Sequence, residues 1–79
     1  MSIETKLARA MSKLDERGVL VLQDPEIDTT RITRDEGRWW SITTEYEDGV
    51  YGTRMVSSRN ELENEIRSWL KCQEQIDSL

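Results

Sequence analysis

The chain has 79 residues, of which 35% are hydrophobic and 34% are charged, and its formal net charge at pH 7 is -5. A chain this short forms one small domain, so residues 1–79 are expected to fold as a single unit. With one cysteine and no histidine, an internal disulfide and the usual zinc sites are excluded, and no stretch approaches the roughly 20 apolar residues of a membrane span. We therefore expect a soluble, cytoplasmic protein.

The first segment predicts an amphipathic helix that begins after Ser2 and ends at Gly18. Serine is a favoured N-cap residue, and glycine commonly follows the last turn of a helix. Between them, apolar residues recur at intervals of three and four along one side, namely Ile3, Leu7, Ala10, Met11 and Leu14. The other side carries basic residues and is interpreted as a solvated face.

Two short strands are expected next. Residues 19–22 (VLVL) are apolar enough to be a strand covered on both faces. Residues 23–29 are expected to form a loop, because Pro25 cannot donate to a β-ladder. Residues 30–34 alternate polar and apolar side chains and predict a second strand, followed by a three-residue turn at 35–37 that would pair Ile32 with Trp40.

Residues 38–56 (RWWSITTEYEDGVYGTRMV) alternate with period 2 on both sides of Asp48-Gly49, a strong hairpin signal. A two-residue turn there would pair Ile42 with Met55. This register places Trp40, Ile42 and Met55 on the core face, and Trp39 and Arg54 on the opposite face, which no helix remains to cover. Trp39 and Arg54 would then belong to an exposed contact patch.

Ser58 and Glu61 form a capping box that opens a second helix. Its stripe contains Leu62, Ile66, Trp69, Leu70 and Ile76, but Gln73 interrupts it. The helix should be longer than the strands, so its last turns are expected to overhang the sheet and could support a homodimer through Trp69, Gln73, Ile76 and Leu79. Cys72 flanks the stripe and is interpreted as a buried or half-buried inert thiol.

The elements together predict an α+β fold in the order α-β-β-β-β-α. It would be a two-layer sandwich with two helices on one face of an antiparallel sheet of three to four strands. In a sheet whose strands follow one another, the loop at 23–29 and the turn at 47–49 emerge at the same end.

The excess acidity lies in the middle of the chain, where residues 21–48 hold eight acidic and three basic side chains. The carboxylates expected at one end of the sheet are Asp24, Glu26, Asp28, Glu45, Glu47 and Asp48. A negative surface repels nucleic acid and attracts basic surfaces, so the expected partner is a basic protein or a nucleoprotein complex, without direct nucleic-acid or membrane contact. The alternative is that the acidity only keeps the protein soluble.

No pattern in the sequence indicates catalysis. Ser-His and Cys-His pairings cannot be formed without histidine, and a glycine-rich phosphate loop is absent. We therefore expect no catalytic residue, no cofactor and no metal ion, and a protein that is not an enzyme.

A hairpin (YEDGVYGTRMV) that runs into a capped amphipathic helix (SSRNELENEIRSWL) resembles the layout of small phage-encoded inhibitors of bacterial defence, the anti-CRISPR proteins. The resemblance implies a stoichiometric inhibitor, in the cytoplasm of a bacterial host, whose acidic side chains mimic DNA phosphates and block DNA access to a CRISPR effector. Two alternatives remain open. One is a small accessory or dimerisation module of a larger assembly, and the other is a weak nucleic-acid-binding module that uses Trp39 and Arg54.

Overall fold

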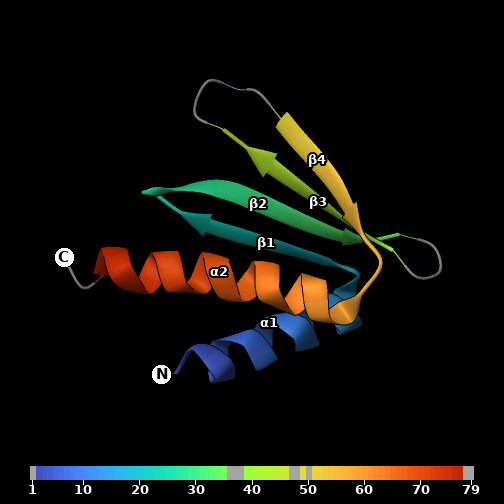
Figure 1. The fold of residues 1–79 in the computed structure, drawn as a ribbon, viewed down its shortest axis with the longest axis horizontal. Helices are drawn as coiled ribbons and strands as arrows, with labels where there is room; N and C mark the ends of the chain where they lie inside the picture. The colour runs from blue at the N-terminus through green and yellow to red at the C-terminus, as the bar shows by residue number, and fades with distance from the viewer. Residues whose placement is uncertain (1, 36–38, 47–48, 50, 78–79) are drawn as a thin grey trace.

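Four strands stand between two helices in the chain, and they form one antiparallel sheet in the order β1-β2-β3-β4. In this computed structural model the described residues are 2–35, 39–46, 49 and 51–77. The elements are α1 (Ile3–Arg17), β1 (Val19–Asp24), β2 (Ile27–Arg34), β3 (Trp40–Glu45), β4 (Tyr51–Val56) and α2 (Arg59–Asp77). Both helices lie on the same side of the sheet (Figure 1). The predicted α+β fold and its element order are therefore confirmed.

Helix α1 has the two ends that its sequence predicts. The Ser2 hydroxyl accepts a hydrogen bond from the Thr5 amide at 3.2 Å, which satisfies one of the free amides of the first turn. Gly18 has a φ of 74°, and its amide donates to the Leu14 carbonyl at 2.8 Å. The left-handed backbone favours glycine at this position and stops the helix directly before β1.

The predicted loop at 23–29 is wrong, because β1 and β2 continue through most of it. Asp24 pairs with Ile27, so only Pro25 and Glu26 form the turn. Proline in the turn does not interrupt a ladder, and the Asp24 carboxylate closes the turn by accepting from the Glu26 amide at 2.9 Å.

Strand β1 is covered on one face only, in contrast to the prediction. Leu20 and Leu22 are buried, whereas Val19 and Val21 are each 40% exposed. The helices occupy one side of the sheet, and apolar side chains on the other side of β1 remain in contact with water.

The β2–β3 pairing differs from the predicted register by two residues. Ile32 lies opposite Ile42, and Arg34 lies opposite Trp40. The Asp35 amide also donates to the Trp39 carbonyl at 2.9 Å, so Asp35 belongs to the paired region and not to the predicted turn at 35–37. A shift by an even number keeps each side chain on its face, and Ile32 is fully buried as predicted.

The β3–β4 pairing differs by one residue, which exchanges the two faces of β4. Ile42 lies opposite Arg54 instead of Met55, and Trp40 lies opposite Val56. Val56 is consequently buried at 6% exposure, whereas Met55 is 46% exposed and the prediction that it belongs to the core is wrong. The Gly49 amide donates to the Tyr46 carbonyl, while Asp48 and its predicted two-residue turn lie outside the described residues.

Helix α2 begins at the predicted capping box, where the Ser58 hydroxyl accepts from the Glu61 amide at 3.5 Å. The helix then crosses the sheet diagonally (Figure 1). Its first half contacts β4, since Glu65 forms an ion pair with Arg54. Its second half reaches the β1–β2 hairpin, where the Trp69 indole donates to the Asp28 carbonyl at 3.4 Å.

The core lies between the helices and the sheet. Its buried residues are Leu7, Ala10, Met11 and Leu14 from α1, Leu20, Leu22, Ile32, Ile42 and Val56 from the sheet, and Leu62, Ile66 and Leu70 from α2. Trp40 and Trp69, predicted to be core residues, are partly buried and pack against this cluster. The Trp40 indole N–H has no hydrogen-bond partner among the described residues, so its burial carries a desolvation cost.

Candidate functional site

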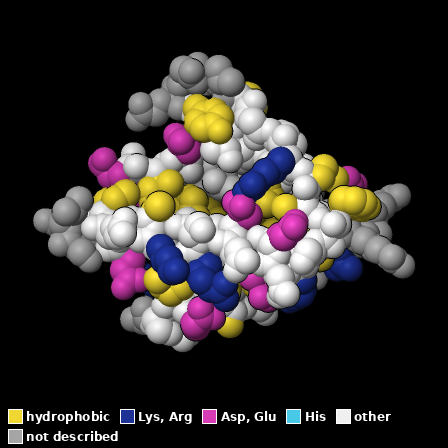
Figure 2. Space-filling view, viewed as in Figure 1, with side chains coloured by type: hydrophobic (Ala, Val, Ile, Leu, Met, Phe, Trp, Pro, Cys, Tyr) yellow, Lys and Arg dark blue, Asp and Glu magenta, His cyan; other side chains and the backbone are white. Residues whose placement is uncertain are grey.

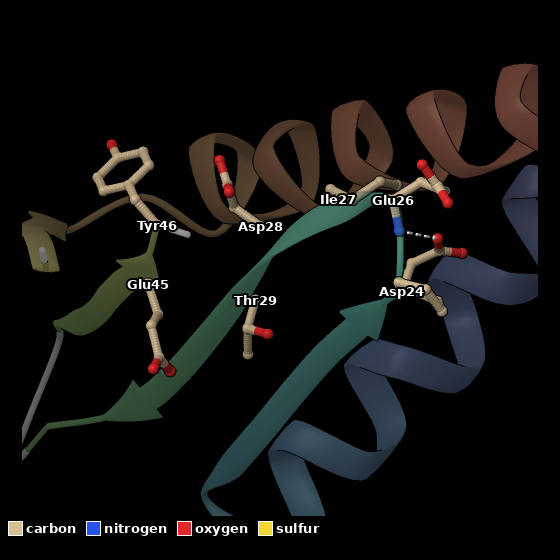
Figure 3. Close-up of a pocket in the computed structure, with 8 residues that line it drawn as sticks. Asp24, Glu26, Ile27, Asp28, Thr29, Glu45 and Tyr46 are labelled. Atoms are coloured by element: carbon tan, nitrogen blue, oxygen red, sulfur yellow. Dashed lines mark hydrogen bonds between the residues drawn. The ribbon is translucent and has the colours of Figure 1, made fainter. Parts of the chain in front are cut away.

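The sheet has a hollow of about 320 Å³ at the end where the β1–β2 turn emerges (Figure 3). We call it the acidic hollow. It is lined by Asp24, Pro25, Glu26, Ile27, Asp28, Thr29, Glu45 and Tyr46. Four of the six carboxylates assigned to the predicted site therefore line one hollow, while Glu47 and Asp48 lie outside the described residues.

Hydrogen bonds from two elements fix the Asp24 carboxylate. One oxygen accepts from the Glu26 amide at 2.9 Å within the turn, as Figure 3 shows. The other accepts from the Gln73 side-chain amide of α2 at 3.2 Å. Gln73, expected in the overhanging last turns, and Trp69, expected in the core, instead hold the β1–β2 hairpin against α2. The expected overhang is thus wrong for Gln73, although the dimer proposed from it remains a prediction.

Glu45 joins the acidic hollow from the end of β3. It lies opposite Thr29 in the β2–β3 ladder and opposite Tyr51 in the β3–β4 ladder. One of its carboxylate oxygens accepts from the Tyr51 hydroxyl at 3.5 Å. Strand order explains this meeting, because consecutive antiparallel strands place the β1–β2 turn and the end of β3 at the same end of the sheet.

No lysine or arginine lines the acidic hollow. Among the described residues, the ion pairs lie elsewhere: Arg54 binds Glu65, Arg59 binds Asp15 and Glu63, and Arg67 binds Glu4. These pairs neutralise acidic groups on and beside the helices. Because none of the described lining residues is basic, the four carboxylates of the acidic hollow produce a local negative potential.

One of these helix contacts, the pair between Asp15 and Arg59, is bidentate. The two terminal guanidinium nitrogens, Nη1 and Nη2, donate to the two carboxylate oxygens, at 3.1 and 2.9 Å. These hydrogen bonds lower the pKa of Asp15 below its usual value, and they raise the pKa of Arg59. The pair joins the end of α1 to the start of α2 and lies apart from the acidic hollow.

Trp39 and Arg54 do not share a face with each other or join the acidic hollow. Trp39 precedes β3 at the end opposite Glu45 and is 49% exposed. Arg54 lies opposite Ile42, which places it on the helix side, where it pairs with Glu65. The predicted position of Arg54 on the uncovered face is therefore wrong, and the cause is the one-residue difference in register.

The acidic hollow can accept hydrogen bonds from cationic groups. Its carboxylates are acceptors, and the hydroxyls of Thr29 and Tyr46 add donors and acceptors at its border. Arginine and lysine side chains of a partner fit this chemistry, because charge-assisted hydrogen bonds to carboxylates are stronger than neutral ones. In the described part of the chain, no three histidine, cysteine or acidic residues are placed to hold a metal ion.

Sequence reasoning did not identify a second hollow, of about 180 Å³, between α2 and the sheet. It is largely apolar and is lined by Leu22, Thr30, Ile32, Ile42, Thr44, Glu65, Ser68, Trp69 and Cys72. Figure 2 shows hydrophobic side chains in the gap between α2 and the sheet. Cys72 is exposed there instead of buried or half-buried as predicted. The diagonal course of α2 leaves this gap, and no local pattern specifies that course.

Along the described residues, neither helix is long and apolar enough to cross a lipid bilayer. The sequence matches no protein-family model, and no curated protein and no solved structure shows significant similarity to the chain.

Proposed function

We propose that this chain is a non-enzymatic binding protein that inhibits a basic protein or a nucleoprotein complex through its acidic hollow. The supporting observation is that Asp24, Glu26, Asp28 and Glu45 line one hollow without a lysine or arginine among its lining residues. These carboxylates surround one end of the sheet, with Asp28 and Glu45 pointing in opposite directions (Figure 3), and a basic partner surface would meet several negative charges there. Solubility alone requires negative charge but does not require it at one place.

The position of the carboxylates supports occlusion of a surface that binds nucleic acid. Grooves that bind DNA present rows of arginine and lysine to successive phosphates. A surface with carboxylates on a hairpin and on the neighbouring strand presents several negative charges to such a groove. Binding would then exclude the nucleic acid by competition, one chain for each site, and would require no chemical step.

The concrete form of the proposal is a phage anti-CRISPR protein that blocks DNA access to a CRISPR effector in the bacterial cytoplasm. Its support is the resemblance of layout together with the acidic hollow. The alternative of an accessory module of a larger assembly would use the same surface with a different basic partner. The nucleic-acid-binding alternative has less support, since Trp39 and Arg54 do not form a common patch.

The test compares two triple charge reversals with equal net charge. The first, Glu26→Lys, Asp28→Lys and Glu45→Lys, changes the acidic hollow. The matched control, Glu16→Lys, Glu61→Lys and Asp77→Lys, changes exposed helix residues outside it. Each tagged protein is used to capture partners from a bacterial lysate at low salt, and the captured material is then washed at rising salt.

We expect the intact protein and the control to capture the same basic protein or nucleoprotein complex. We expect the acidic-hollow variant not to capture this partner. Rising salt should release the partner from the intact protein, because exposed charges are screened beyond about 8 to 10 Å at physiological ionic strength. Equal loss in both variants would show that net charge alone decides binding. Retention by the acidic-hollow variant would place the site elsewhere, and turnover of a substrate would contradict the proposal that the chain is not an enzyme.

A further inference from the structure

Strand β4 is a free edge of the sheet. Among the described residues it pairs with β3 only, and it lies at the edge of the sheet opposite β1 (Figure 1). Backbone N–H and C=O groups on the other side of such a strand are available to pair with another strand. Its register with β3 is continuous from Tyr51 to Val56. The edge can therefore accept a regular antiparallel partner.

The other edge, β1, is less suited to pairing. Its register with β2 shifts between Leu22 and Asp24, which interrupts the regular ladder. Helix α1 also packs directly against β1, through Leu7, Met11 and Leu14 in the core that contains Leu20 and Leu22. A strand added beside β1 would meet a broken ladder and a neighbouring helix.

The outer face of β4 carries two exposed apolar side chains, Tyr51 at 64% and Met55 at 46% exposure. Tyr51 lies two residues before Thr53, and Met55 lies two residues after it. Pairing two β4 strands in antiparallel orientation about Thr53 would bring Tyr51 of each copy opposite Met55 of the other. A cross-strand aromatic–aliphatic pair of this kind stabilises a sheet, and here the two-fold axis produces it twice.

We propose that two copies of this chain associate through β4, antiparallel and centred on Thr53, to form one continuous eight-stranded sheet. The occupant of the free edge is a second copy of the chain. The Thr53 side chain already contacts Thr43 of β3, with the two hydroxyl oxygens 3.2 Å apart. The pairing extends this row of threonines across the two-fold axis.

Charge disfavours the neighbouring register that is centred on Arg54. Centring the two-fold axis on Arg54 would place two arginines directly opposite each other, and like charges in that position destabilise a sheet. Centring it on Met55 would draw Val56 into the new ladder, although Val56 is buried beneath α2. With Thr53 at the centre, Arg54 faces Gly52 of the second copy and no like charges meet.

On the helix side of the sheet, the side chains of the two paired β4 strands also complement each other. Gly52 has no side chain, and the ring of Tyr46 covers it, with ring atoms 3.4 Å from the place that a Cβ would occupy. Arg54 of the second copy would extend beside this ring. A guanidinium next to a tyrosine ring makes a favourable cation–π contact. The ion pair between Arg54 and Glu65 stays within each copy of the chain.

Disulfide trapping tests the register directly. In a Cys72→Ser background, Thr53→Cys places the new thiols opposite each other, at the 4.5 to 5.5 Å Cα separation of antiparallel pairs, which a disulfide spans. We expect mild oxidation to give a covalent dimer. Tyr51→Cys alone and Met55→Cys alone should stay monomeric, because each thiol is about 13 Å from its symmetry mate. An equal mixture of these two variants should crosslink.

Sedimentation over a range of concentrations tests the uncrosslinked protein. We expect a reversible dimer that Met55→Lys weakens about tenfold through its two symmetry-related pairs. Adding Tyr51→Glu should restore association, because the introduced charges of opposite sign then face each other. An intact protein that stays monomeric at millimolar concentration overturns the proposal. A dimer that survives Met55→Lys and dissociates with Ile76→Lys also overturns it, since association would then run through α2.

Discussion

The burial of Val56 gives the sharpest test of the structure, because Met55 would occupy its place in the alternative register. Val56→Ala removes two carbons from a side chain that is 6% exposed. At about 0.8 kcal/mol for each buried methylene, with a further contribution from the cavity that remains, the loss is about 2 kcal/mol. A domain of this size has about 3 to 5 kcal/mol of stability from its core, so the variant should lose roughly half of it.

Met55→Ala is the matched control, since Met55 is adjacent in sequence and 46% exposed. Its loss should stay below about 1 kcal/mol, because much of the removed surface is already in contact with water. Urea denaturation followed by tryptophan fluorescence measures the loss of stability in both variants. A loss of about 2 kcal/mol should lower the urea concentration at the unfolding midpoint by roughly 1 to 2 M. Low protein concentration keeps association through β4 from adding to stability. A larger loss for Met55→Ala than for Val56→Ala would refute the register.

Two further predictions concern the helix ends. Gly18→Ala should destabilise the protein by about 1 kcal/mol and Gly18→Asn by less, because a φ of 74° is costly for alanine and asparagine tolerates it better; equal thermal midpoints would contradict this. The lowered pKa of Asp15 means that its contribution to stability is present above its usual value near 3.8 and is lost as the pH falls through the lowered value. The stability difference between the intact protein and Asp15→Asn should therefore shrink from pH 6 to pH 3 in urea denaturation, and a constant difference would show that Asp15 does not contribute through its charge.

The helices were predictable because local chemistry determines their ends. The Ser2 and Ser58 caps and Gly18 act within one turn of the chain, and the apolar stripes between them face the core as their spacing indicates. The order of the helices and strands was also predictable from local sequence patterns. Even the face of Ile32 was predicted correctly, although its predicted partner was wrong, because an error of two residues leaves the alternation of a strand unchanged.

The register of β4 could not be predicted from its pattern. Judged by hydrophobicity, Tyr51, Thr53 and Met55 make a better core face than Gly52, Arg54 and Val56. In the structure Gly52, Arg54 and Val56 are on the helix side of the sheet, but only Val56 is buried, because α2 covers β4 only at that end. The alternation of apolar and polar residues indicates burial only where a second layer covers the strand. Because α2 crosses the sheet diagonally, it does not cover most of β4.

The acidic hollow was predicted in part for a related reason. Asp24, Glu26, Asp28 and Glu45 meet because consecutive strands alternate direction, which the order of elements already implies. The bonds from Trp69 and Gln73 that fix the hairpin depend on where the second half of α2 lies. Contacts between residues more than 40 positions apart have no signature in a short sequence window.

The position of α2 after the four strands has a consequence for folding, because this helix supplies part of the core that covers the sheet. Each strand pairs with its neighbour in sequence, so the sheet can form from contacts that close only short loops. The buried side chains Leu62, Ile66 and Leu70 come from the last helix, and they cover strands made much earlier. A nascent chain that has reached only β4 therefore exposes the helix side of its sheet to water and to other proteins. The core is complete only when α2 packs against the sheet.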